Sequence, residues 1–252
     1  MQFDIAEALG DQKHRREALV ILNQPIPNRR KLYSIWDRFV YRLCADGGAN
    51  QLFEARMPIP DKLLPDIIHG DLDSLDLGVR TYYENKGVKV SKDPDQYSTD
   101  FGKAMRLLLD QRVAGQLTDV LILGSISGRV DQGLGLLHEM YREFTRHPEI
   151  RLWLYSERNL SFVLPSTTNY INLSNSWGLI TGTIGILPIF GPATITTIGL
   201  EWDVENWETS MGGQVSTSNH IIAPTLVSVK TSTPVLFTME LKVSKEDANG
   251  TA

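Results

Sequence analysis

The sequence predicts an N-terminal α/β domain with a parallel sheet, followed by a C-terminal antiparallel β-sandwich. Up to about residue 156, short apolar runs rich in β-forming residues alternate with helical patterns, as in βαβ units. Beyond Arg158 the chain is rich in Thr, Ile, Val and Gly, with closely spaced turn residues and little helical periodicity. The 252 residues, 42% of them hydrophobic, suffice for two modest domains. We therefore predict domains at residues 1–157 and 158–252.

In the first half, expected strands are short apolar runs next to turn residues, and expected helices carry apolar residues at helical spacing. The expected strands lie at 18–23, 65–71, 88–90, 119–124 and 150–156, and the expected helices at 29–43, 78–87, 98–112 and 130–144. Ser98 or Thr99 is a natural N-cap for the third of these helices. This strand-helix alternation favours a parallel sheet.

The second half consists of expected strands alone. Short β-rich runs lie at 161–166, 169–173, 178–190, 193–202, 213–219 and 225–241, separated by turn residues. Such spacing is typical of an antiparallel sandwich or barrel, and we predict the sandwich. The tail at 244–252 is polar, and we expect it to fray.

The charge balance and the cysteine content exclude several classes of protein. Lys and Arg number 25 against 30 Asp and Glu, and this net charge of −5 argues against broad nucleic-acid binding, which needs a basic face. Cys44 is the one cysteine, so no internal disulfide forms and a reducing compartment is expected. Residues 1–16 lack a signal peptide's apolar run, and no run approaches the roughly 20 residues of a membrane span. We expect a soluble, cytoplasmic protein with no nucleic-acid or membrane partner.

Acidic residues of the first half gather in a few loops. They are Asp46 before two glycines, Asp71 and Asp73 after "DIIHG", Asp95 and Asp100 around "QYST", and Asp131 after "LILGSISGRV". The carboxyl ends of parallel strands form the ligand crevice of an open sheet, so these loops would bring carboxylates to one edge. Close carboxylates repel unless a cation lies among them, and oxygen ligands without a Cys or His pair indicate Mg²⁺. Mg²⁺ usually also binds phosphate oxygens, which makes a nucleotide the expected companion.

Each feature also has a simpler interpretation. Asp71 and Asp73 alone are more typical of a turn, and Asp100 of a first helical turn. The loop from Gly124 to Gly128 fits a plain connection, although it follows a strand and opens a helix, the context in which backbone N–H groups bind phosphate. Four such features in one domain favour a metal–phosphate site. Neither GxxxxGK[ST] nor HExxH occurs.

Several motifs occur in the order and spacing of one family. They are "CADGGAN" (44–50), "GDLDS" (70–74), "DQYSTDFGKA" (95–104) and "SGRVDQ" (127–132), followed in the second half by "SWGLI…LPIFG", "TTIGLEW" and "VSTSN". From about Leu19 to about Leu241 the chain resembles thiamine pyrophosphokinase of the eukaryotic type. One loop departs from the family pattern. The corresponding loop of the family is usually richer in glycine than "GSISGRVDQ", in which Ser125 and Ser127 restrict the backbone.

The resemblance implies that ATP and thiamine give thiamine diphosphate and AMP, with Mg²⁺ as cofactor, in a homodimer whose active sites lie between subunits. It implies Asp71, Asp73 and Asp100 as Mg²⁺ carboxylates, with Asp46 a further catalytic residue close by. The implied ATP and phosphate contacts are Gly47, Gln96, Thr99, Lys103, Ser127, Arg129, Asp131 and Gln132. The implied thiamine contacts are Trp202, Ser216, Ser218 and Asn219, in a β domain that also forms the dimer.

Two other functions stay open. One is an ordinary kinase that moves the γ-phosphoryl group to a small alcohol and releases ADP, and the other is a non-catalytic thiamine or nucleotide sensor. In the family reaction the thiamine hydroxyl attacks the β-phosphorus, Arg129 helps to stabilise the transferred group, and Asp71 or Asp100 accepts the proton. Alternate residues of an extended segment project to one side, so we expect Asp71 and Asp73 to face one ion while Leu72 turns to the core.

Overall fold

The computed structural model describes residues 1–9, 17–26, 29–57, 59, 61–110, 117–126 and 128–242. The chain forms two compact units, Asp11–Glu157 and Met1–Gly10 with Arg158–Ala252. The polar tail expected to fray, 244–252, lies outside the described residues. No helix in the described ranges has the length and apolar character needed to cross a membrane.

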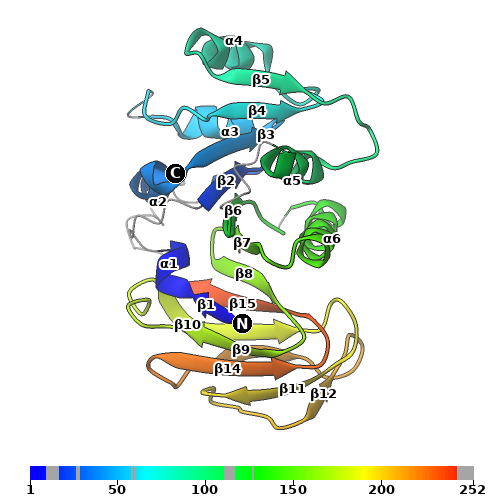
Figure 1. Ribbon diagram of the computed structural model, residues 1–252. Coiled ribbons are helices and arrows are strands. Elements are labelled where there is room, and N and C mark those ends of the chain that lie inside the picture. The colour runs from blue at the N-terminus through cyan, green and yellow to red at the C-terminus, as the bar shows by residue number, and fades with distance from the viewer. Residues whose placement is uncertain are drawn as a thin grey trace. The chain divides into compact units, whose positions relative to one another are not determined.

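The unit Asp11–Glu157 is built on a parallel sheet, as the sequence predicts (Figure 1). Its strands are β2 (Glu17–Ile21), β3 (Tyr41–Ala45), β4 (Ile67–Gly70), β5 (Lys89–Lys92), β6 (Asp119–Leu123) and β7 (Arg151–Tyr155). Their order is β7-β6-β2-β3-β4-β5, and every pair is parallel. All carboxyl ends therefore lie along one edge, where ligands bind in open sheets of this kind.

Helices cover both faces of this sheet. They are α2 (Arg29–Ile35), the 3₁₀ helix η1 (Trp36–Arg38), α3 (Gly48–Ala55), α4 (Leu77–Asn85), α5 (Asp100–Asp110) and α6 (Val130–Arg146). Figure 1 shows α5 and α6 on one side of the strands and α3 on the other. The buried face of α5, with Phe101, Met105 and Leu108, packs in one core with alternate strand residues such as Val20 and Leu43. This packing fixes the first turn of α5 over the middle of the sheet.

The predicted helix at 29–43 is wrong over its second half. Helical structure ends at Arg38, and Tyr41–Ala45 form strand β3, paired in parallel with β2 and β4. The apolar spacing of this segment matches a helix, but Leu43 and Cys44 are fully buried between two neighbouring strands. Tertiary pairing thus overrides the local pattern. Helix α3, which begins at Gly48, was not predicted.

The other unit is an antiparallel β-sandwich, again as predicted. Its strands are β1 (Gln2–Asp4), β8 (Asn159–Leu164), β9 (Thr168–Asn172), β10 (Ile180–Leu187), β11 (Ala193–Ile198), β12 (Trp207–Thr209), β13 (Ser216–His220), β14 (Leu226–Thr231) and β15 (Val235–Leu241). One layer has the order β1-β9-β14-β11-β12, and the other β13-β10-β15-β8. Phe3 of the first layer stacks on Phe162 of the second, with ring centroids 4.9 Å apart, so the two layers share a core.

The first residues depart from the predicted division of the chain, which placed 1–157 together. Strand β1 pairs in parallel with β9, and the terminal ammonium of Met1 donates a hydrogen bond to the carbonyl of Thr168. The short helix α1 (Ile5–Leu9) buries Ile5 and Leu9 in the same unit. The N-terminal segment therefore completes the sandwich.

Candidate active site

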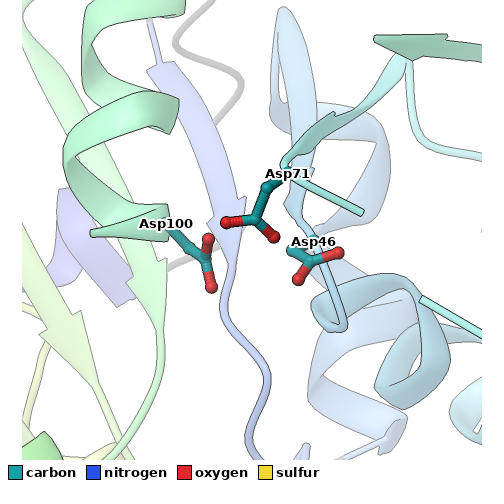
Figure 2. A group of neighbouring side chains, drawn as sticks. All are labelled: Asp46, Asp71 and Asp100. Carbon is teal, nitrogen blue, oxygen red and sulfur yellow. The ribbon is translucent and has the colours of Figure 1, made fainter. Parts of the chain in front are cut away.

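Three carboxylates converge at the carboxyl edge of the parallel sheet (Figure 2). Asp46 directly follows β3, Asp71 directly follows β4, and Asp100 opens α5. One oxygen from each lies within 4.8 Å of the others, a spacing that can hold a metal ion. The adjacency of β3 and β4 brings the first two together, and the packing of α5 across these strands supplies the third.

The backbone at this edge adopts conformations that L-residues rarely take. Asp46 has a φ of 44° and Leu72 a φ of 66°. Gly70 allows the two strand ends to approach, because a Cβ there would lie 2.8 Å from the Cβ of Asp46. Strained backbone is a recurrent feature of functional sites. Leu72 is only half-buried, so the prediction that "DLD" is extended with Leu72 in the core is wrong.

Asp46 is the most buried of the carboxylates, with 1% of its surface exposed. Its Oδ2 accepts a hydrogen bond from the backbone N–H of Ser74, whereas its Oδ1 has no partner within the described chain. Burial, together with the charges of Asp100 and Asp71, raises the pKa of Asp46 to about 6. A buried oxygen without a partner is rare in native proteins. The site therefore offers an open ligand atom.

Asp71 is hydrogen-bonded to Lys103, which the family resemblance implies as an ATP or phosphate contact. The Nζ of Lys103 lies 2.6 Å from Asp71 Oδ2, and this hydrogen bond lowers the pKa of Asp71. The Oδ1 of Asp71 accepts the backbone N–H of Asp73 at 3.3 Å, the contact of an Asx-turn. Burial raises the pKa of Asp100, as does the nearby charge of Asp71. The turn interpretation and the metal interpretation of Asp71 are thus compatible.

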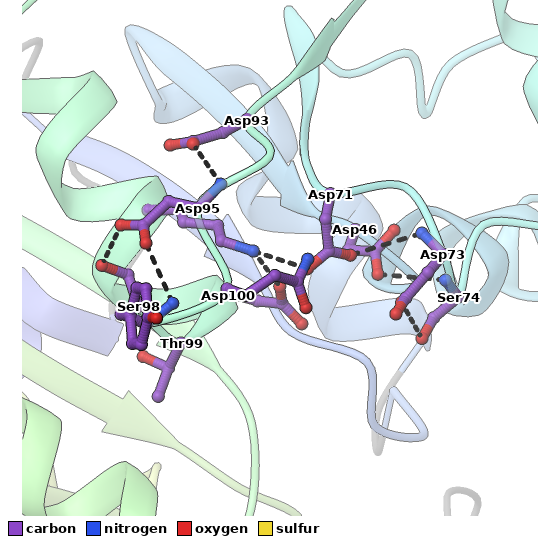
Figure 3. Close-up of polar contacts among 12 residues, drawn as sticks. Asp46, Asp71, Asp73, Ser74, Asp93, Asp95, Ser98, Thr99 and Asp100 are labelled. Carbon is purple, nitrogen blue, oxygen red and sulfur yellow. Dashed lines mark hydrogen bonds and ion pairs between the residues drawn. The ribbon is translucent and has the colours of Figure 1, made fainter.

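The loop between β5 and α5 is fixed by a polar network (Figure 3). Asp95 accepts hydrogen bonds from the backbone of Tyr97 and the hydroxyl of Ser98, and these contacts, with Arg106, lower its pKa to about 2. Arg106 forms ion pairs with Asp95 at 3.2 Å and with Asp93 at 3.0 Å. The network positions the residues that follow, which begin α5.

A cleft of about 530 Å³ opens beside the carboxylates. Of the residues implied for metal, ATP or phosphate, the structure places Asp71, Asp73, Thr99, Asp100, Asp131 and Gln132 in its lining. Gln96 reaches the site from the loop, with its Nε2 3.5 Å from Asp71 Oδ2. Thr99 also caps α5, since its Oγ1 accepts the N–H of Gly102. Asp73 is exposed, and its Oδ1 accepts the hydroxyl of Ser74.

Other implied contacts lie outside the lining of this cleft. Arg129 is exposed and forms an ion pair with Asp131 at 2.6 Å. Gly47 is packed tightly at the start of α3, where a Cβ would collide with the side chain of Asn23. Lys103 is buried and does not line the cleft. Ser127 lies outside the described residues.

The structure adds residues that the sequence analysis missed. Asn23 and Gln24 line the cleft just after β2, and Glu139 lines it from α6. Asn23 ends the predicted strand at 18–23, so its place at a carboxyl end was a usable signal. Asn50 had no such signal. Its amide donates to the carbonyl of Ser74 and accepts the N–H of Asp76, which anchors the loop after β4 to α3.

The β-sandwich has a separate pocket of about 220 Å³. Of the implied thiamine contacts, Trp202, Ser216 and Asn219 line it. Ser218 lies outside its lining, with a φ of 56° in a bulge between β10 and β13. Asn219 is buried, and its amide makes hydrogen bonds in both directions with the backbone of Trp202. Its side chain therefore fixes the loop that presents the half-exposed indole of Trp202.

Comparison with known proteins agrees with this arrangement. Residues 32–154 match the model of the thiamin pyrophosphokinase catalytic domain, and residues 169–236 match that of the thiamin pyrophosphokinase vitamin B1 binding domain. The chain is 35% identical to thiamine pyrophosphokinase 1 of Arabidopsis thaliana, over 90% of this chain and 87% of that protein. It is 29% identical to thiamine pyrophosphokinase of Saccharomyces cerevisiae, over 97% and 91% of the two chains.

Solved structures give the same result over both units. A thiamin pyrophosphokinase from Candida albicans matches with a TM-score of 0.85 and 28% identity, covering 96% of this chain and 93% of that one. The yeast thiamin pyrophosphokinase matches with a TM-score of 0.86 and 27% identity, covering 98% and 93%. The chain belongs to the thiamine pyrophosphokinase family.

Proposed function

We propose that this enzyme transfers a diphosphoryl group from Mg-ATP to the hydroxyl of thiamine, giving thiamine diphosphate and AMP. The observation that carries the proposal is the convergence of Asp46, Asp71 and Asp100 within 4.8 Å, on a chain of this family. The oxygen of thiamine bonds to the β-phosphorus, the bond from that phosphorus to the oxygen bridging to the α-phosphate breaks, and AMP leaves.

The residues at the cleft fit a divalent cation. All donors are carboxylate oxygens, which suit Mg²⁺, and the buried Oδ1 of Asp46 lacks any other partner within the described chain. Asp46, Asp71 and Asp100 would hold the ion, with Asp73 in the lining of the same cleft, and the ion would supply charge neutralisation for the phosphate oxygens. Repulsion among the free carboxylates supports the same assignment.

The remaining groups would position the substrates. The N-terminus of α5 and the side chain of Thr99 offer donors to phosphate oxygens. We assign Asp131 and Gln132, which line the same cleft, to the nucleoside. Asp71 has contacts on both oxygens, from Lys103 and from the backbone of Asp73, whereas the one ion pair of Asp100 among the described residues is a 3.8 Å contact with Lys103. Geometry thus favours Asp100 over Asp71 as the acceptor of the hydroxyl proton.

Product identification tests the reaction. Incubation with ATP, Mg²⁺ and thiamine should give AMP and thiamine diphosphate in equal amounts. ADP with thiamine monophosphate would instead establish an ordinary kinase, and tight binding without turnover would establish a sensor. Asp73→Asn should lower kcat/KM for Mg-ATP about tenfold or more by weakening the metal. Asp76→Asn is the matched control, because it makes the same change three residues along, outside the cleft lining.

We further propose, from the family resemblance alone, a homodimer in which the sandwich of one subunit serves the thiamine side of its partner's site. The test mixes two impaired variants, Asp73→Asn and Trp202→Ala, under conditions that let subunits exchange. If sites are shared between subunits, the mixture should be more active than either variant alone, because each mixed dimer has one site free of both changes. A mixture no more active than the separate variants, while exchange is shown by mass spectrometry, would exclude shared sites.

A further inference from the structure

Lys103 is an unusual lysine, because only 1% of it is exposed. It lies one turn after Asp100 on α5, and the neighbouring Phe101, Ala104 and Met105 are buried with it against the sheet. Lysines are almost never fully buried unless they are paired. The pairs here are with Asp71 at 2.6 Å and Asp100 at 3.8 Å.

The ammonium group is the counter-charge of the acidic cluster. In the described part of the chain, no other cation forms an ion pair with Asp71 or Asp100. Arg106, one turn further along the same helix, pairs instead with Asp93 and Asp95. Burial alone would lower the pKa of Lys103, but the hydrogen bond that Lys103 donates to Asp71 and the charges of the surrounding carboxylates outweigh burial and hold that pKa above its ordinary value.

We propose that Lys103 is a positioning residue that serves as a resident counter-ion for the cation site. It keeps Asp71 and Asp100 at their close spacing when no divalent cation is bound. Because it also repels a divalent cation, it keeps cation affinity low until a nucleotide triphosphate brings compensating negative charge. The inference rests on the proposed cation site. It implies that the enzyme binds the cation together with the nucleotide, as a nucleotide–metal complex.

A direct contact between Lys103 and a phosphate is the competing role. Lys103 does not line the cleft, and its Nζ is within hydrogen-bond distance of Asp71. A phosphate contact would require the ammonium of Lys103 to break its ion pair with the partly buried Asp71, which leaves that carboxylate without its counter-charge. The counter-ion role requires no movement.

The test measures Mn²⁺ binding in the absence of nucleotide, with the concentration of free Mn²⁺ read from its paramagnetic resonance signal. Lys103→Met should bind Mn²⁺ about tenfold more tightly than the unaltered enzyme. With a chelator present, the variant should have a lower melting temperature than the unaltered enzyme. Adding Mn²⁺ should remove most of this difference in melting temperature. Arg106→Met is the matched control: it removes a cation from the same helix, and its Mn²⁺ affinity should not change.

A second variant keeps the test decisive if Lys103→Met folds poorly. Adding Asp71→Asn removes the charge that the lysine offsets, so the double variant should regain stability in chelator. A double variant that stays unfolded, or a single variant with unchanged Mn²⁺ affinity and weakened ATP binding, would overturn the counter-ion role. AMP formation is scored separately, so loss of the proposed reaction and loss of this inference are distinct results.

Discussion

Asn50 should control the geometry of the proposed cation site although it does not line the cleft. Its side chain bridges the loop that carries Asp71 and Asp73 to helix α3, through the carbonyl of Ser74 at 2.8 Å and the N–H of Asp76 at 3.1 Å. Removing it with Asn50→Ala leaves that loop attached to α3 by fewer contacts. The loop's strained backbone should then relax away from the geometry that brings the carboxylates together.

The magnitude follows from the two lost contacts. Each hydrogen bond contributes about 1 kcal/mol, and alanine recovers roughly 0.6 kcal/mol through its better helix propensity. Asn50→Ala should therefore lower the free energy of unfolding by about 1 kcal/mol, since both bonds are partly exposed to water. The effect on catalysis should be larger, with a rise of about tenfold in the Mg²⁺ concentration needed for half-maximal AMP formation.

Two measurements check this prediction, urea unfolding and AMP formation over a Mg²⁺ titration. The control is Glu54→Ala, an exposed position further along α3. If Asn50→Ala loses stability but keeps the Mg²⁺ dependence of the unaltered enzyme, the loop does not depend on this anchor and the argument fails. An unchanged free energy of unfolding would refute the hydrogen-bond estimate itself.

Two further predictions concern the two ends of the sheet. Gly70→Ala puts a Cβ 2.8 Å from the Cβ of Asp46 and 3.3 Å from the backbone of Asp46. This variant should lower the free energy of unfolding by about 2 kcal/mol and abolish most of the activity. The control is Gly78→Ala, which has open space around it and should change neither quantity. At the amino end, burial raises the pKa of Asp119, but hydrogen bonds from Arg151 and Trp153 outweigh it and hold that pKa below its ordinary value. The ionised Asp119 therefore stabilises the fold fully above the ordinary Asp pKa of about 4, and this stabilisation is lost as the pH falls through the folded pKa. Asp119→Asn should lower the free energy of unfolding by about 3 kcal/mol near neutral pH and by much less in acid. An equal decrease at both pH values would contradict the stabilising role of the ionised carboxylate.

The place of Asp71 at the carboxyl edge could be predicted because it follows a recognisable strand, whereas Asp46 follows a segment that was predicted to be helical and Asp100 opens a helix. Asp71 comes after an apolar run, and the carboxyl ends of parallel strands share an edge whatever the details of their order. The contacts between these residues could not be predicted in this way. That Lys103 points back to Asp71, rather than into the cleft, depends on how α5 packs across the sheet. Asn50 lies in helix α3, which was not predicted, and nothing in its local sequence indicates that it bridges to Ser74 and Asp76.

Long-range pairing explains the errors in the fold. The segment 41–45 has helical spacing in its apolar residues, and only the strands on both sides of it make β3 a strand. Strand β1 pairs with β9, 168 residues away for Gln2 and Tyr170, and nothing in the first nine residues indicates that partner. Elements whose identity depends on a distant partner lie beyond what local periodicity can show.

The two ends of the parallel sheet differ in how their buried carboxylates are hydrogen-bonded, and this contrast favours the carboxyl end as the functional one. At the amino end Asp119 is buried, but Arg151, Trp153 and Thr118 satisfy both its oxygens. At the carboxyl end Asp46 is still more buried, its backbone is strained, and one oxygen has no partner in the described chain. A structural carboxylate would be expected to resemble Asp119, because an unsatisfied buried acceptor costs about 1–3 kcal/mol. Among the described residues, Asp46 keeps an unsatisfied oxygen although two further carboxylates lie within 4.8 Å of it. A cation bound among the three carboxylates would account for this arrangement.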